Sequence, residues 1–147
     1  MPSPKKKASD ACSRYIRLRD ALKYCQKYGI DLSQFNRPED IIGKCVTCGK
    51  VKSWIRMDNG HFKGRGSGGG SGVYFDERNQ HLQCKHCNAF EGGRPDEYRE
   101  FIIEEYGQEV LDELNLKHRI PIDLGSVAMQ ATECYYKDQY KELVNSI

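Results

Sequence analysis

The chain lacks three features that define common functional classes. It has no apolar run that approaches the about 20 residues of a membrane-spanning helix. Its basic start, residues 1–7, is not followed by an apolar stretch, so it is not a secretory signal and export is not expected. No Gly-Lys-Ser or Gly-Lys-Thr follows the glycine-rich segment 64–72, which excludes a P-loop for nucleotides. We therefore expect a cytoplasmic protein that binds no membrane.

Cysteine is the most informative residue that is present. Four of the seven cysteines form two Cys-x-x-Cys pairs, which in a reducing cytoplasm indicate a metal site rather than a disulfide framework. Two pairs supply four thiolates to a tetrahedral zinc ion and leave no open position for chemistry, so the predicted zinc is structural. The predicted ligands are Cys45, Cys48, Cys84 and Cys87, and the semi-buried thiols left over are Cys12, Cys25 and Cys134.

The net charge of +2 is distributed unevenly along the 147 residues. Residues 1–30 carry +6, residues 31–95 carry +3 and residues 96–147 carry −7. Basic surfaces bind polyanions without sequence preference, through phosphate neutralisation and counterion release. We therefore predict that the first two-thirds of the chain contacts DNA and that the acidic last third faces away from it.

Residues 10–28 are predicted to form a basic helix, because apolar residues recur at helical spacing, Ser9 or Asp10 can cap its start and Gly29 can end it. Its basic side chains are predicted to lie along a phosphate backbone, and the alternative is a plain amphipathic helix packed on the core. These side chains include Arg14, Arg17 and Lys23. Residues 31–44 are predicted to form a loop or a short helical turn.

Between the cysteine pairs the sequence predicts a hairpin. One strand ends at His61, and the chain returns through residues 73–75 and 79–83. Segment 64–72 is predicted to be its mobile loop, with Lys63 and Arg65 at the base able to meet phosphate. A helical element is predicted to begin within 89–93, followed by helices at 96–106, 108–116 and 126–144. The predicted parts are thus a basic tail and helix (1–44), a zinc-binding core (45–95) and a helical extension (96–147).

The order of His61, Asn79 and Asn88 between two zinc knuckles resembles the HNH, or ββα-metal, nucleases. The sequence Cys-Lys-His-Cys-Asn-Ala-Phe-Glu-Gly at 84–92 looks like the knuckle of phage endonuclease VII. A closer resemblance, to the NinG family of lambdoid phages with its Rap recombination endonuclease, covers most of the chain. It is carried, in the same order, by segments 11–20, 60–62, 75–79, 83–85 and 106–110.

These resemblances imply a fold and an activity. The fold is α+β, with a zinc-stabilised ββα-metal core and flanking N- and C-terminal helices. The activity is that of a metal-dependent endonuclease on branched DNA, such as Holliday junctions and D-loops. Its setting is the cytoplasm of an infected or lysogenic bacterium, where its protein partners are phage or host recombination proteins.

The chemistry of phosphodiester hydrolysis suggests a role for each of the residues that carry the resemblance to the HNH nucleases. His61 is the best general base, since a neutral imidazole can activate water near pH 7. Asn88 offers a carbonyl oxygen to Mg2+ or Mn2+, which neutralises charge on the phosphate and on the leaving oxygen. Asn79 is expected to hold the loop through side-chain to backbone hydrogen bonds.

The sequence departs from the endonuclease VII pattern at Gly60, where that pattern has an acidic metal ligand. The missing ligand must come from elsewhere, and the candidates are His81 and Asp58. In a regular strand residues 58 and 61 project to opposite faces, whereas His81 lies on the return strand with the same parity as Asn79. We therefore favour His81 as a catalytic residue and second metal ligand.

Two functions of different classes are consistent with these residues. The first is the structure-selective endonuclease; the alternative is a non-catalytic, zinc-stabilised DNA-binding protein that assists recombination. His61 and Asn88 favour the first, because a passive zinc module does not need them. A zinc protein that binds RNA would need exposed aromatic residues for stacking, whereas several tyrosines fall at helical core spacing.

A four-way junction has approximate two-fold symmetry, and the chain supplies one His61/Asn88 set, so we expect a C2 homodimer. Its interface is expected among the apolar positions of the C-terminal helices. These are Tyr98, Phe101, Ile102, Tyr135 and Leu143. The alternative is a monomer in which the same side chains cover the core.

Overall fold

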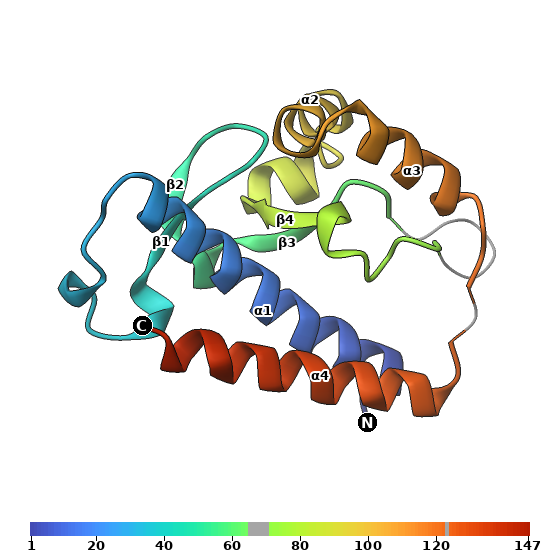
Figure 1. Cartoon of the computed structure of the whole chain (residues 1–147), viewed down its shortest axis with the longest axis horizontal. Coiled ribbons are helices and arrows are strands. Elements are labelled where there is room, and N and C mark those ends of the chain that lie inside the picture. The colour runs from blue at the N-terminus through green and yellow to red at the C-terminus, as the bar shows by residue number, and fades with distance from the viewer. Residues whose placement is uncertain (65–70, 123) are drawn as a thin grey trace.

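The computed structural model describes residues 1–64, 71–122 and 124–147, and shows an α+β protein arranged around one long helix. Two small antiparallel hairpins lie behind this helix, a second long helix runs beside it, and two shorter helices lie at the opposite edge (Figure 1). Within the described residues, no helix is long and apolar enough to cross a membrane.

The long central helix α1 spans Pro4–Lys27. It begins earlier than predicted, because the Ser3 side chain accepts a hydrogen bond from the Lys6 amide (3.1 Å) and Pro4 favours the first helical turn. The expected start at Ser9 or Asp10 is therefore wrong. The end agrees with the prediction, since Gly29 follows the helix with a φ of +65°, a conformation that favours glycine.

Each hairpin has two short strands. β1 (Ile42–Lys44) pairs with β2 (Val51–Ser53), and β3 (Asp58–His61) pairs with β4 (Gln80–Gln83). The predicted strand that ends at His61 is confirmed, and its return is confirmed for residues 80–83. Residues 73–75 form a turn and Asn79 belongs to a 3-10 turn, so these parts of the predicted return are wrong. β1 falls in a segment predicted to be a loop, since three residues are too few to show a periodicity. Single helical turns lie between α1 and β1 at Leu32–Gln34 and Pro38–Asp40, between β2 and β3 at Trp54–Arg56, and before β4 at Glu77–Asn79.

The helical element after the second hairpin is a π-helical turn at His86–Phe90, which starts earlier than the predicted 89–93 because it includes Cys87 of the second cysteine pair. The three helices that follow confirm the predictions to within two residues. They are α2 (Pro95–Tyr106), α3 (Gln108–His118) and α4 (Ser126–Asn145). Gly107, with a φ of +95°, separates α2 from α3.

The core is shared between elements from both ends of the chain. Leu18 and Ala21 of α1 pack with Trp54 and Leu82 of the hairpins, and α4 covers this cluster with Tyr140 and Leu143. A second cluster joins α2 and α3 to Val73, Phe62 and Val46. α4 therefore lies along α1 and closes the side of the molecule opposite α2 and α3 (Figure 1).

Most residues predicted to form a dimer interface belong to this core instead. Tyr98 and Ile102 are 1% and 0% exposed, and Phe101 and Leu143 are half-buried against the two clusters. Only Tyr135 is exposed. Their positions agree with the alternative, in which these side chains cover the core of one chain. The sequence could not separate the two cases, because an amphipathic helix has the same apolar stripe whether it packs on its own core or on a partner.

Candidate functional site

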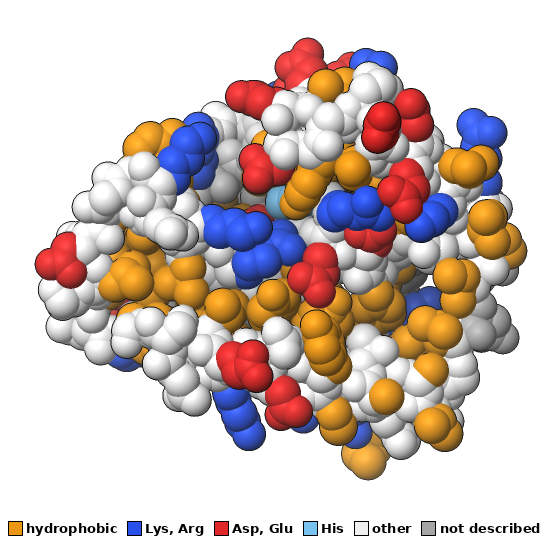
Figure 2. Space-filling view, viewed as in Figure 1, with side chains coloured by type: hydrophobic (Ala, Val, Ile, Leu, Met, Phe, Trp, Pro, Cys, Tyr) orange, Lys and Arg blue, Asp and Glu red, His pale blue; other side chains and the backbone are white. Residues whose placement is uncertain are grey.

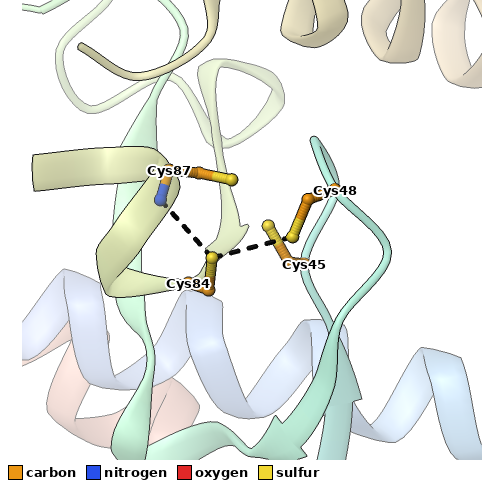
Figure 3. Close-up of side chains that lie close together, drawn as sticks. All are labelled: Cys45, Cys48, Cys84 and Cys87. Carbon is orange, nitrogen blue, oxygen red and sulfur yellow. Dashed lines mark hydrogen bonds between the residues drawn. The ribbon is translucent and has the colours of Figure 1, made fainter. Parts of the chain in front are cut away.

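Four cysteine sulfurs converge between the two hairpins (Figure 3). The Sγ atoms of Cys45, Cys48, Cys84 and Cys87 all lie within 4.8 Å of one another. Those of Cys48 and Cys84 are 3.7 Å apart, and two thiolates on one tetrahedral zinc, with Zn–S bonds of about 2.3 Å, are separated by about 3.8 Å. The predicted cluster is therefore confirmed as a group that fits one zinc ion.

Tight backbone turns hold both cysteine pairs. In the first, the Cys45 amide donates to the Lys50 carbonyl (2.8 Å) and the Gly49 amide donates to the Cys45 carbonyl (2.9 Å). In the second, the Cys87 amide donates to the Cys84 sulfur (3.4 Å). Because one pair follows β1 and the other follows β4, a zinc ion bound by all four thiolates ties the two hairpins together.

The two thiols of the first pair differ in how readily they ionise. Burial opposes ionisation of Cys45, but hydrogen bonds from the Thr47 side chain and from backbone amides outweigh it and lower its pKa to about 6. Desolvation and the neighbouring thiols instead raise the pKa of Cys48. Zinc ligation requires thiolates, so Cys45 is more ready than Cys48 to bind at neutral pH.

His61, the predicted base, is the last residue of β3 and is half-buried. Its ring stacks on Tyr74, with centroids 4.4 Å apart and an interplanar angle of 15°. The Ser9 hydroxyl of α1 donates to the Tyr74 hydroxyl (3.1 Å), which connects this stack to the central helix. The imidazole is thus held in one plane by an aromatic side chain that sequence reasoning did not identify.

Asn79 is fully buried and forms the hydrogen bonds expected of it. Its Oδ1 accepts from the Lys63 amide (2.8 Å), and its Nδ2 donates to the carbonyls of Lys63 (3.0 Å) and Val73 (3.1 Å). One side chain therefore joins both ends of the segment that connects β3 to the return strand. Asn79 fixes the backbone just after His61, and its role is therefore to hold the chain in place.

Asp58, the first residue of β3, is brought into contact with Asn88. The Asn88 Nδ2 donates to Asp58 Oδ2 (3.0 Å), and the Lys85 Nζ lies 2.7 Å from Asp58 Oδ1. Burial alone would raise the pKa of Asp58, but the bonds from Lys85 and Asn88 lower it below its usual range. Asp58 is therefore a carboxylate at neutral pH, beside the amide predicted to bind a divalent metal.

The structure corrects the choice of His81 as the second metal ligand. His81 is 3% exposed, and its two ring nitrogens lie 3.2 Å from the Tyr98 hydroxyl and 2.8 Å from the Tyr106 hydroxyl. Both nitrogens are thus occupied. The parity argument failed because Asn79 belongs to a 3-10 turn rather than to the strand. Asp58, the other candidate, is the one that contacts Asn88.

Gly60 lacks an acidic side chain for a steric reason. A Cβ on Gly60 would overlap the Gln83 side chain, with 2.8 Å to its Cβ and 2.9 Å to its Cδ. Gln83 is fully buried and is fixed there, since its Nε2 donates to the Gly93 carbonyl (2.8 Å) and to Thr47 (3.0 Å). The site therefore leaves no room for a ligand at Gly60.

The predicted basic side chains of α1 do not form one open face. The Arg14 guanidinium lies over the Tyr140 ring of α4 (4.3 Å). Arg17 lies over Trp54 (5.2 Å) and donates to the Met57 carbonyl (3.2 Å). Helical periodicity could not show that α4 and the first turn after β2 cover this side of α1.

Lys23, the third of these residues, lines a cleft of about 430 Å³ between α1 and α2. Basic side chains on one wall face acidic side chains on the other (Figure 2). The acidic wall comes from α2 and consists of Glu97, Glu100, Glu104 and Glu105. Of the two loop residues predicted to meet phosphate, Lys63 is half-buried with its Nζ 4.9 Å from the Phe62 ring centroid, and Arg65 lies outside the described residues.

Comparison with known proteins places the chain in a family. The sequence profile described as "Bacteriophage Lambda NinG protein" matches residues 4–146. The chain belongs to the NinG family. It is 32% identical over 118 residues to "Protein ninG" of Escherichia phage 933W, which covers 78% of this chain and 55% of that protein. The protein of the same name from Escherichia phage lambda is 32% identical over 118 residues, with 78% and 54% covered.

"Protein ninG" of Salmonella phage P22 is also similar, at 34% identity over 88 residues, or 60% of this chain and 42% of that protein. The chain thus spans about half the length of the curated NinG relatives it matches. No solved structure matches it.

Two further residues complete the site of this NinG chain. Lys85 contacts Asp58, and its place between the zinc cysteines was the one sequence signal for it. Tyr98 donates its hydroxyl hydrogen to the Gly60 carbonyl (2.6 Å), although its helical spacing indicated only a core residue. Both contacts join segments more than 25 positions apart in the sequence, which local patterns cannot reveal.

Proposed function

We propose that this NinG protein is a metal-dependent endonuclease that hydrolyses phosphodiester bonds in branched recombination intermediates, such as Holliday junctions and D-loops. The observation that carries the proposal is the contact between Asp58 and Asn88 (3.0 Å), on the strand that ends at His61 and beside the zinc-binding turn. Asp58 and Asn88 offer a carboxylate and an amide to a divalent metal, and His61, on the same strand as Asp58, offers an imidazole. Hydrolysis of a phosphodiester requires groups of these kinds.

The donor set at Asp58 and Asn88 fits Mg2+ or Mn2+. Both residues offer hard oxygen ligands, and Mg2+ is commonly held by one or two carboxylates with water and substrate phosphate in the other positions. The Asn88 side chain directs its Nδ2 to Asp58, so its amide group must flip before Oδ1 can bind the cation. Lys85 must also leave the carboxylate. When bound, the cation neutralises charge on the phosphate and on the leaving 3′ oxygen.

The protein's own groups carry out the remaining steps. His61 accepts a proton from the attacking water, whose oxygen forms the new bond to phosphorus while the bond to the 3′ oxygen breaks. Tyr74 holds the imidazole plane through the stack, and Asn79 holds the peptide chain after His61. Lys85, once displaced from Asp58, places its ammonium group near the phosphate. The zinc cluster keeps the two hairpins in register and takes no part in the chemistry.

The decisive experiment incubates the purified protein with a labelled four-way junction and with a linear duplex of matched sequence, in EDTA, Mg2+ or Mn2+. We expect metal-dependent cleavage of the junction, its loss in Asp58→Asn, and its retention in His81→Gln. Binding without cleavage under every metal condition would contradict the nuclease and leave the accessory DNA-binding protein. Equal cleavage of junction and duplex would contradict the selectivity for branches.

The setting of this activity is the cytoplasm of an infected or lysogenic bacterium, where branched DNA arises during phage recombination. Its protein partners would then be phage or host recombination proteins. This part of the proposal rests on membership of the phage NinG family.

A further inference from the structure

A line of hydrogen bonds connects α2 to the peptide that precedes His61. The Tyr98 hydroxyl donates to the Gly60 carbonyl (2.6 Å) and lies 3.2 Å from His81 Nδ1. The other ring nitrogen of His81, Nε2, lies 2.8 Å from the Tyr106 hydroxyl. Tyr98 and His81 are 1% and 3% exposed. The two hydrogen bonds of Tyr98 therefore lie in a water-poor interior, where their geometry is well defined, while the bond to Tyr106 is part-buried at the cleft between α1 and α2.

The direction of each bond follows from the first one. The Gly60 carbonyl can only accept, so the Tyr98 hydroxyl hydrogen points to it and the Tyr98 oxygen is left to accept from His81 Nδ1. The Nε2 atom then carries no hydrogen and accepts from the Tyr106 hydroxyl. This arrangement needs a neutral His81, which agrees with the lowering of its pKa by burial. His81 is thus fixed in the Nδ1–H tautomer.

Gly60 is the place in β3 where such a support matters. The residue has no side chain to anchor it by packing, and a glycine backbone has the greatest conformational freedom to lose. The Gly60 carbonyl and the His61 backbone nitrogen belong to the same planar peptide unit. A hydroxyl held from α2 therefore fixes the plane from which the His61 side chain projects.

We propose that Tyr98 is a positioning residue for His61, and that His81 and Tyr106 hold the Tyr98 hydroxyl in the required direction. This inference rests on the proposed function, in which His61 is the general base. Tyr98 itself touches neither substrate nor metal. Its effect passes through the Gly60 peptide to the imidazole.

The test compares Tyr98→Phe with Ile102→Val. The first keeps the ring and removes only the hydroxyl, while the second loosens the same buried side of α2 by one methyl group without touching Gly60. For Tyr98→Phe we expect kcat on the junction to fall about threefold to tenfold, the rate equivalent of one neutral hydrogen bond, with KM unchanged. Ile102→Val should leave kcat unchanged, and Tyr106→Phe should lower it by less than Tyr98→Phe.

A second measurement does not depend on cleavage. Amide hydrogen exchange and the ring resonances of His61, followed by NMR, should change in Tyr98→Phe and stay as in the wild type in Ile102→Val. An unchanged His61 in Tyr98→Phe would overturn the positioning role even if the nuclease is active. Absence of cleavage by the wild type would refute the proposed function, while the NMR comparison would still decide whether Tyr98 holds His61.

Discussion

His61 is the residue whose chemistry separates a nuclease from a DNA-binding protein. We predict that His61→Ala lowers the hydrolysis rate by roughly 10²- to 10⁴-fold, the usual contribution of a general base. Junction affinity and the thermal midpoint should stay near the wild-type values, because the ring is half-buried and belongs to neither of the two core clusters described above. Single-turnover cleavage and equilibrium binding measure the two effects.

The matched control is His118→Ala, which removes a half-buried histidine whose Nδ1 lies 2.8 Å from the Ser71 hydroxyl. This histidine belongs to no metal or catalytic cluster in the described part of the chain. It should leave the rate unchanged. If His61→Ala cleaved the junction at the wild-type rate, His61 would have no role in the mechanism.

His81 predicts a pH dependence of stability. Burial lowers its pKa to about 4 in the folded protein, whereas the ordinary value is about 6.5. Between these values the unfolded chain binds the proton and the folded one does not, so stability is complete above pH 6.5 and is lost as the pH falls toward 4. The loss should reach on the order of 3 kcal/mol.

Urea unfolding at several pH values measures this loss, and His81→Gln is the comparison that isolates it. Acid also protonates the zinc thiolates in both proteins, so the informative quantity is the difference between the two pH profiles. The wild-type profile should fall more steeply between pH 6.5 and 4. Parallel profiles would show that His81 titrates at its ordinary pKa.

At the scale of elements, the cysteine cluster spans the two hairpins, beside a hydrogen bond from the Val46 amide to the Leu82 carbonyl (3.0 Å). β1–β2 and β3–β4 are separate two-stranded sheets, and two strands alone are marginally stable in water. We predict that Cys84→Ser unfolds or aggregates the protein, since structural zinc contributes on the order of 10 kcal/mol to folding. Circular dichroism measures the folding of the purified protein, and a metal analysis measures its bound zinc.

Cys134→Ser provides the control, because Cys134 is an exposed thiol of α4 that lies outside the cluster. It should retain both the fold and the zinc. A chelator should reproduce the effect of Cys84→Ser on the wild type. A folded wild-type protein without bound metal would contradict the structural role of the site.

At the scale of the whole molecule, an exposed apolar strip marks the surface most suited to a second copy of the chain. The strip lies over the connection between α3 and α4 (Figure 2). Its members are Leu116, Ile120, Ile122, Leu124 and Val127, each at least 45% exposed. Since all the C-terminal residues predicted at a dimer interface except Tyr135 belong to the core, a C2 dimer on a four-way junction would have to use a surface of this kind.

We predict that the protein dimerises on junction DNA and that Val127→Asp prevents this. Val127 is 79% exposed, so the change should not affect folding. Val51→Asp, at an exposed position of β2, is the matched control and should dimerise normally. Light scattering at micromolar protein concentration, with and without the junction, measures the oligomeric state. A monomer under both conditions would exclude the dimer and leave single-strand nicking as the activity.

Features encoded in short stretches of sequence were predictable. The Cys-x-x-Cys spacing predicted the cysteine cluster that fits a metal ion, and helical periodicity predicted α2, α3 and α4 to within two residues. The order of His61, Asn79 and Asn88 carries the proposed site. Each depends on residues close together in the chain, where spacing alone limits the geometry. Asn79 was foreseen for the same reason, since a buried amide at a turn bonds the backbone beside it.

Contacts between distant segments decided the rest. The packing of α4 along α1 placed the Arg14 guanidinium against Tyr140, although Arg14 stays exposed, and Arg17 is half-buried over Trp54. A helical pattern does not say which element lies beside a given face. The choice between Asp58 and His81 depended on a turn that interrupts strand parity and on two tyrosines from α2 that enclose the imidazole. Gly60 could be understood only when Gln83 was seen to fill its side-chain space, because steric exclusion arises between chain segments that the sequence keeps apart.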